Sequence, residues 1–161
     1  MGRAHGYGLR VTATLFVAAA GGHLAQLVEL AQRLPPDASD VAVWVTSDHA
    51  QSRSLLAGRQ VVFVPEVRPR DVSQVMRCVP IARRLHAEWS FTRVISTGSG
   101  VALGFLPYLS SRGVRAHYIE SSSRMSRPSA TGQVLSALPG IRLYTQYEWN
   151  AKGRWKFLSG M

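Results

Sequence analysis

The sequence of 161 residues is poor in cysteine, in acidic residues and in long hydrophobic runs. Its single cysteine, Cys78, has no partner for an internal disulfide, which fits a reducing compartment. The apolar stretch 11–20 is too short to cross a membrane as a helix, and no small-residue cleavage site follows it. We therefore expect a cytoplasmic protein.

Acidic residues number only 9 against 19 lysines and arginines, which gives a formal net charge of +10, and almost all of the basic residues are arginine. Such an excess favours partners that carry phosphate, namely nucleic acid, anionic lipid or a diphosphate substrate. A non-catalytic nucleic-acid-binding protein is one alternative. Against it, the basic residues are scattered and no aromatic–basic motif of a known RNA-binding module occurs.

The stretch 11–34 organises the chain, because it combines a strand, a glycine turn and a helix. Residues 11–17 are β-branched and apolar enough for a strand that is buried on both faces. Gly21 and Gly22 then allow a sharp turn, and His23 lies at the N-terminus of the helix that follows. Helix N-termini bind phosphate or diphosphate, and a histidine there can donate a hydrogen bond or move a proton. The alternative is a plain strand–turn–helix junction in which His23 is a solvated cap.

Strand and helix patterns alternate along the rest of the chain. We expect strands at 11–17, 41–46, 60–64, 93–96, 115–119 and 141–145, and helices at 24–34, 49–57, 71–89, 101–109 and a short one ending at 138. This alternation predicts a Rossmann-like α/β domain, an open parallel sheet with helices on both faces. The domain should span 11–149, between a flexible basic arm (1–10) and a basic, aromatic tail (150–161) that is a candidate for partner contact.

Two of the predicted helices raise the question of a membrane surface. In the helix 71–89, an apolar face that includes Val72 and Met76 lies opposite Arg77 and Arg84, and the helix 101–109 is apolar nearly all round. A covering helix with a solvated basic face is one reading, and a helix that rests on anionic lipid is the other. The apolar character of the helix 101–109 indicates burial, a membrane-facing patch or a protein interface.

Polar residues follow the predicted strands. Thr97, Gly98 and Ser99 come after the fourth strand, and a run from Glu120 to Arg127 comes after the fifth. In open α/β sheets ligands bind outside the carboxyl ends of the strands, so these segments are expected to converge with Gly21-Gly22-His23 on one crevice. In the alternative, the second segment is a polar loop in which Glu120 pairs with Arg124.

Several motifs in one order support a family resemblance: Gly21-Gly22-His23, Thr97-Gly98, Tyr118-Ile119-Glu120-Ser121 with Arg124, Ser129-x-Thr131-Gly132, and Gln146. Together they resemble the acceptor-side, membrane-recruiting subunit of the two-subunit UDP-GlcNAc:lipid-diphosphate-sugar N-acetylglucosaminyltransferase. This family serves lipid-linked oligosaccharide, capsule and exopolysaccharide biosynthesis. The resemblance implies the N-terminal half of a GT-B glycosyltransferase, inactive without a separate donor-binding subunit, and peripheral on the inner face of the membrane.

The resemblance also implies roles for individual residues. The acceptor is a sugar on a polyprenyl diphosphate, while the UDP-sugar is bound mainly by the partner. His23 or Glu120 is the expected catalytic base. Acceptor or diphosphate binding falls to Gly21, Gly22, Thr97, Gly98, Ser99, Ser121, Arg124, Thr131, Gly132 and Gln146. Metal, cofactor and nucleic acid are not expected.

A nucleotide-dependent oxidoreductase is the remaining alternative, since Asp48 follows the second strand where a ribose-binding acid is found in such enzymes. Against it, the first turn reads Ala-Ala-Gly-Gly-His in place of the G-x-G-x-x-G pattern. The chain is also too short for an additional substrate domain.

Overall fold

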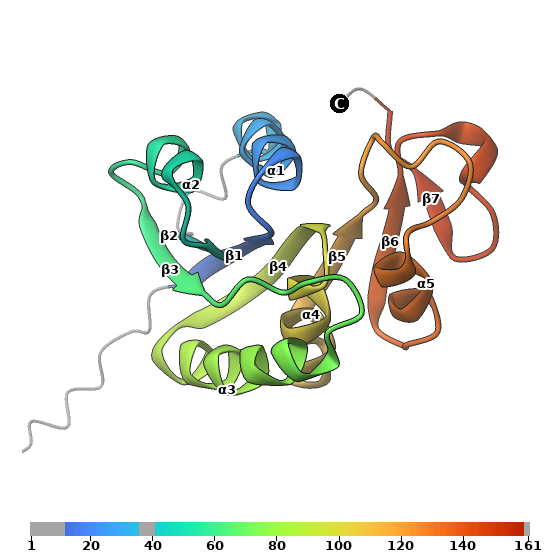
Figure 1. The fold of residues 1–161 in the computed structure, drawn as a ribbon. Coiled ribbons are helices and arrows are strands. Elements are labelled where there is room, and N and C mark those ends of the chain that lie inside the picture. Colours follow the sequence, from blue (N-terminus) through green and yellow to red (C-terminus); the bar gives the residue numbers. More distant parts are fainter. Residues whose placement is uncertain (1–11, 36–40, 160–161) are drawn as a thin grey trace, which may run out of the picture.

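A seven-stranded parallel sheet forms the centre of the computed structural model, which describes residues 12–35 and 41–159 (Figure 1). The strands are β1 (Thr12–Ala18), β2 (Val41–Ser47), β3 (Gln60–Val64), β4 (Ser90–Gly98), β5 (Arg115–Ile119), β6 (Ile141–Thr145) and β7 (Trp155–Phe157). They lie in the order β3-β2-β1-β4-β5-β6-β7, and every neighbouring pair is parallel. The predicted Rossmann-like α/β fold is confirmed.

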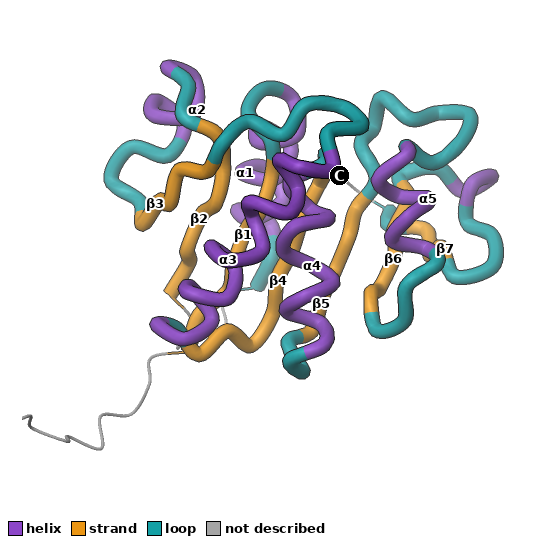
Figure 2. The backbone as a smooth tube through the Cα atoms, turned by 60° about the horizontal axis from the view of Figure 1, so that its bottom comes forward, coloured by secondary structure: helices purple, strands orange, loops and turns teal. Residues whose placement is uncertain are grey.

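Helices cover both faces of this sheet. They are α1 (Gly22–Arg33), α2 (Ala50–Leu55), α3 (Val72–Glu88), α4 (Val101–Ser111) and α5 (Ala130–Ser136), with a short 3-10 turn, η1 (Glu148–Asn150). On one face Leu24 and Leu27 of α1 pack with Phe16 and Trp44 of the sheet. On the other face α3, α4 and α5 form a second layer, which lies in front of the strands in Figure 2.

The order of the strands reverses between β1 and β4. From β1 the chain builds outward through β2 to β3, and then returns along α3 to place β4 on the other side of β1. The turns that follow β1 and β4 therefore lie next to each other at the carboxyl edge of the sheet. Such a reversal is the point at which open α/β sheets form a ligand crevice.

Two segments extend the sheet beyond the prediction. β4 runs from Ser90 to Gly98, so Thr97 and Gly98 belong to the strand and not to the turn after it. β7 lies in the predicted tail and pairs with β6, and the guanidinium of Arg154 holds it there by donating to the carbonyls of Ser136, Leu138 and Ile141 at 2.5–2.8 Å. The described part of the tail is thus integrated into the domain, while the predicted arm 1–10 lies outside the described residues.

The structure decides between the alternatives for α4 and corrects the predicted apolar face of α3. α4 is buried along most of its length and packs against α3, so its apolar character reflects the core and not a membrane-facing patch. α3 turns Cys78, Ala82 and Leu85 inward, whereas Val72 and Met76 are 70% and 59% exposed. A periodic pattern identifies an apolar face, but it does not show which end of that face extends beyond the neighbouring helix.

We expect His117 on β5 to make the fold sensitive to acid. Its ring stacks on Tyr144 at 5.9 Å, and burial together with the charges of Arg142, Arg115 and Arg93 lowers its pKa from 6.5 to about 4. Between these two pH values the unfolded chain binds a proton that the folded chain does not, so stability should fall as the pH is lowered through this window. Urea denaturation at several pH values should show a flatter dependence for His117→Gln. Arg142→Gln should bring the folded pKa of His117 closer to 6.5 and so narrow the pH range over which stability falls. If the free energy of unfolding of His117→Gln depends on pH in the same way as that of the wild type, this assignment is wrong.

Candidate functional site

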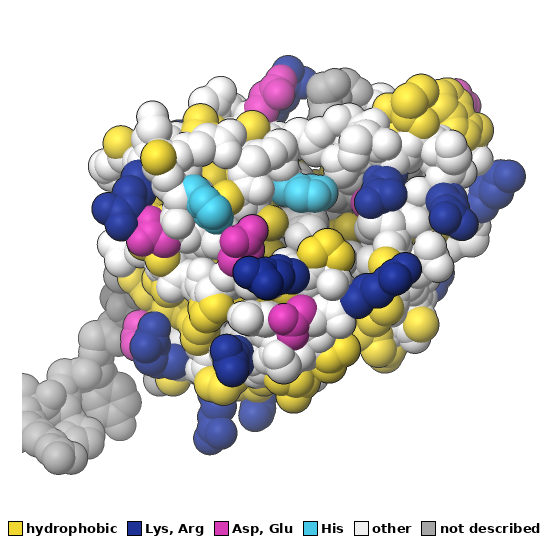
Figure 3. All heavy atoms as spheres, in the orientation of Figure 1, with side chains coloured by type: hydrophobic (Ala, Val, Ile, Leu, Met, Phe, Trp, Pro, Cys, Tyr) yellow, Lys and Arg dark blue, Asp and Glu magenta, His cyan; other side chains and the backbone are white. Residues whose placement is uncertain are grey.

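A cleft of about 630 Å³ opens at the carboxyl edge of the sheet, between the turn after β1 and the loops after β2 and β3. Figure 3 shows histidine side chains at the surface of this face of the molecule, next to acidic ones. The cleft is lined by Ala19, Ala20, Gly21, His23, Ser47, His49, Ala50, Gln51, Glu66, Val67, Pro69 and Ser99. Of the predicted site residues, it brings together Gly21, His23 and Ser99.

His23 is fixed to the end of β4 by two hydrogen bonds. Its ring Nδ1 lies 2.9 Å from the carbonyl oxygen of Thr97, and the hydroxyl of Thr97 donates to the carbonyl of His23 at 2.6 Å. Because a carbonyl oxygen only accepts, Nδ1 must carry the hydrogen, which leaves Nε2 of the neutral ring as a proton acceptor. Thr97 therefore fixes the orientation of the His23 ring, and Nε2 is the ring atom that can accept a proton.

Two of the predicted glycines are required by this geometry. Gly21 caps α1 with φ of 93°, a backbone conformation that favours glycine. Gly98 has φ of 111°, and a Cβ added there would lie 3.0 Å from two atoms of the His23 ring. Gly98 thus leaves the space that His23 occupies.

The far wall of the cleft carries polar residues that the sequence prediction missed. His49 follows β2 and Glu66 follows β3, and the His49 Nε2 lies 3.8 Å from a Glu66 carboxylate oxygen. Both side chains are about half exposed, at 45% and 65%. The signal that marks Glu120, a polar residue just after a buried strand, also applies to His49 and Glu66.

Glu120 is buried, with 3% exposure, and does not line this cleft. One carboxylate oxygen accepts from the Tyr118 hydroxyl and the Ser121 N–H, both at 3.3 Å, and the other accepts from the N–H and hydroxyl of Ser129 at 2.9 and 3.0 Å. These contacts tie the loop after β5 to the start of α5. Within the described residues no ion pair joins Glu120 to Arg124, which is exposed.

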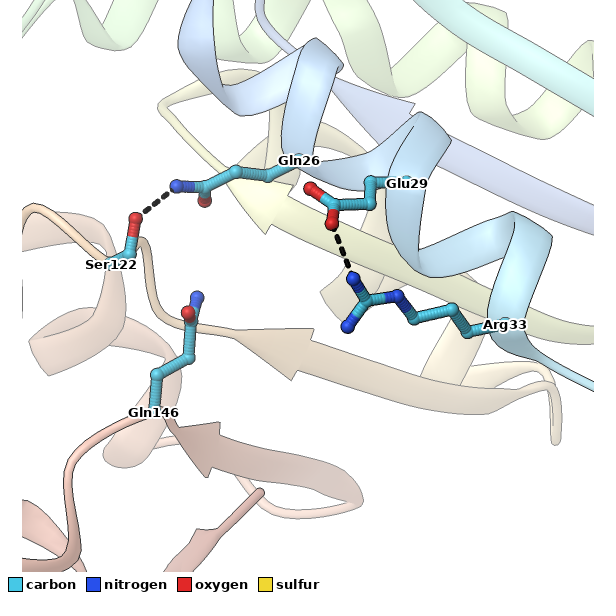
Figure 4. Close-up of a pocket in the computed structure, with 5 residues that line it drawn as sticks. All are labelled: Gln26, Glu29, Arg33, Ser122 and Gln146. Atoms are coloured by element: carbon cyan, nitrogen blue, oxygen red, sulfur yellow. Dashed lines mark hydrogen bonds and ion pairs between the residues drawn. The ribbon is translucent and has the colours of Figure 1, made fainter. Parts of the chain in front are cut away.

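Of the remaining predicted residues, Gly22 is exposed at the start of α1, and the others lie in the part of the chain around Glu120. Gln146 donates to the Glu120 carbonyl at 3.0 Å, and the Gly132 N–H donates to the Ser129 hydroxyl at 3.0 Å. Ser121 is buried in the same loop, and Thr131 is partly buried in the first turn of α5. A second pocket of about 260 Å³ lies between α1 and this loop (Figure 4), and it is lined by Gln26, Glu29, Arg33, Ser122 and Gln146.

The predicted site residues thus form two groups, one around His23 and one around Glu120. Tyr118 connects them, because its hydroxyl contacts Glu120 and would also lie 3.5 Å from a Cβ added at Gly98. Burial and the charge of Glu120 raise the pKa of Tyr118, so the phenol keeps its proton near neutral pH.

Asp48, on which the oxidoreductase alternative depends, already has a partner. Both of its carboxylate oxygens accept from the Arg53 guanidinium, at 2.6 and 2.7 Å, and these bonds lower the pKa of Asp48. Across residues 12–35 and 41–159 no group of three or more histidine, cysteine or acidic side chains is arranged to hold a metal ion.

The comparisons with known proteins concern the fold. No protein-family model matches the sequence, and a search of curated proteins gives no match. Among solved structures, that of MurG from Acinetobacter baumannii is similar, with a TM-score of 0.70 and 15% sequence identity over 92% of this chain and 45% of the MurG chain. The chain therefore shares the Rossmann-like α/β fold of the matched part of MurG. It spans less than half of the length of MurG.

We expect Glu120 to contribute to stability and His23 to contribute little. Replacing Glu120 by Ala leaves the N–H and hydroxyl of Ser129 without their acceptor, which should lower the free energy of unfolding by about 1–3 kcal/mol. His23→Ala removes a partly exposed side chain and one hydrogen bond to the Thr97 carbonyl, and should cost about 1 kcal/mol. Urea denaturation of both variants measures the difference. Equal stability of the Glu120→Ala variant and the wild type would show that Glu120 does not hold the loop.

Proposed function

We propose that this chain is the acceptor-binding subunit of a bipartite glycosyltransferase of polysaccharide or lipid-linked oligosaccharide biosynthesis. It binds a sugar on a polyprenyl diphosphate and recruits a donor-binding subunit, which supplies the UDP-sugar. The observation that carries the proposal is the fixed His23 beside a cleft, at the strand-order reversal of a GT-B domain. The structural similarity to MurG, a GT-B glycosyltransferase, supports the glycosyltransferase part of the proposal.

The acceptor diphosphate binds where α1 meets the cleft. No side chain caps the first N–H groups of α1, and Gly21 and Gly22 leave the backbone accessible. Free N–H groups and the positive end of the helix dipole favour a diphosphate at this position. Ser99 adds a hydroxyl on the same side of the cleft.

His23 takes the proton during transfer. The acceptor hydroxyl attacks the anomeric carbon of the UDP-sugar, a new C–O bond forms, and the bond between that carbon and the UDP oxygen breaks. Nε2 of His23 accepts the hydroxyl proton, since Nδ1 is occupied by Thr97. Glu120 is the less suitable base because the protein already donates four hydrogen bonds to its two carboxylate oxygens.

We expect the chain alone to bind the acceptor but not to transfer sugar, because the catalytic site of a GT-B enzyme closes between two halves. Calorimetry with a short-chain isoprenyl diphosphate N-acetylglucosamine should detect binding, while UDP-GlcNAc should not bind measurably. Transfer should appear only when the chain is co-expressed with a donor-binding subunit, for which the product of the neighbouring reading frame is the first candidate. In that complex His23→Ala should lower the rate about 10²-fold or more.

Turnover by the isolated chain would contradict the bipartite arrangement. Wild-type rates for His23→Ala, at normal stability, would show that this cleft is not the catalytic site. Gln133→Ala is the matched control, because Gln133 is exposed on α5 away from the cleft and its loss should change neither binding nor rate.

Membrane attachment belongs to the same proposal. No helix in the described parts of the chain has the length and apolar character needed to cross a bilayer. Val72 and Met76 project from the start of α3, and Arg68, Arg70 and Arg77 are exposed near them. Exposed apolar side chains flanked by arginine are typical of peripheral binding to anionic lipid.

We expect the chain to float with anionic liposomes at low salt and to be released as ionic strength rises, because screening weakens the attraction of the arginines. Replacing Val72 and Met76 together by Ser should reduce flotation at every salt concentration. Replacing Arg70 and Arg77 by Gln should remove mainly the salt-sensitive part. Equal flotation with neutral and anionic vesicles would rule out the electrostatic contribution.

A further inference from the structure

We propose that the wall of the cleft opposite His23, formed by His49, Gln51 and Glu66, binds the first sugar of the acceptor. This sugar subsite rests on the proposed function, because it assumes that the diphosphate binds beside His23. It specifies which residues of the cleft recognise the sugar part of the acceptor. The ligand class is a single pyranose attached to a diphosphate.

The cleft is larger than the diphosphate site alone. His23 and Ser99 lie on one side, and the loops after β2 and β3 enclose the rest of its 630 Å³ volume. Pockets of about 300–1,000 Å³ accommodate whole small-molecule ligands, and few polar groups suffice to orient them. If the diphosphate of the acceptor binds at α1, the sugar attached to it lies against His49, Gln51 and Glu66.

The polar groups of this wall are available to sugar hydroxyls. The 3.8 Å between His49 Nε2 and the Glu66 carboxylate exceeds hydrogen-bond length, so a hydroxyl can bridge the two groups. Gln51 makes no side-chain hydrogen bond to any described residue, although it lines the cleft. Imidazole, amide and carboxylate together offer donors and acceptors, which is what a polyhydroxyl ring requires.

Apolar side chains complete the subsite. Val67 and Pro69 follow Glu66 on the same loop, and they offer a surface for the C–H groups of a pyranose ring. Val67 is held in place at the start of α4, because a Cβ added at Gly100 would lie 2.7 Å from Val67 Cγ1. This wall therefore has a defined position relative to His23.

The second pocket fits a sugar less well, because its polar groups already contact each other. Gln26 donates to the Ser122 hydroxyl, and Glu29 pairs with Arg33 at 2.5 Å (Figure 4). Gln146 donates to the backbone of Glu120. A sugar that bound there would have to replace these contacts.

The test compares two probes on the full chain: a short-chain isoprenyl diphosphate, and the same molecule carrying one N-acetylglucosamine on its terminal phosphate. We expect calorimetry to show about 10-fold or tighter binding of the glycosylated probe. Glu66→Gln, Gln51→Leu and His49→Leu should each reduce that preference and leave binding of the bare probe unchanged. His23→Ala should weaken both probes alike, and Glu29→Gln, a matched change in the second pocket, should alter neither.

The outcomes separate the two proposals. If both probes bind equally to the wild type, or if Glu29→Gln removes the preference, the sugar subsite is wrong while the diphosphate site stands. Failure of both probes to bind overturns the proposed function and the subsite with it. If UDP-GlcNAc competes with the glycosylated probe and His49→Leu abolishes its binding, the wall belongs to a donor site, and the inference is overturned. Thermal melting of each variant confirms that it is folded.

Discussion

The candidate site depends on the reciprocal contact between His23 and Thr97. These residues are 74 positions apart in the chain, and two hydrogen bonds join the first turn of α1 to the end of β4. The contact fixes the tautomer of His23 and bridges the place where the strand order reverses. Gly98 has no Cβ and so makes room for the ring. The strand order sets the position of the cleft, and this contact fixes the His23 ring within it.

Glu120 is a polar residue at a strand end that stabilises the fold. A carboxylate with 3% exposure needs hydrogen-bond donors, and the backbone and hydroxyl of Ser129 provide them on one side. The result is a stable loop between β5 and α5, with Gly132 packed closely against the carboxylate. The buried part of the polar run after β5 is therefore explained by the need for an ordered loop, whereas Arg124 is exposed to solvent.

Local patterns predicted most elements, and contacts between distant segments account for the exceptions. Strands such as β1 and β2 are short, mostly apolar stretches whose character is visible in the sequence alone. β7 is three residues long and exists through pairing with β6 and the contacts of Arg154, neither of which leaves a local signal. The same holds for α4, since only its packing against α3 decides between a core helix and a membrane-facing one.

The sequence by itself determined the alternation of strands and helices, the glycines of the first turn and the position of His23 at a helix start, because each depends on neighbouring residues. The tertiary structure decided which strand ends meet. It brought His49 and Glu66 into the cleft with His23 and kept Glu120 out of it, because strand order sets the distances between loops. Strand order arises from the packing of the whole sheet, so no single segment of the sequence encodes it.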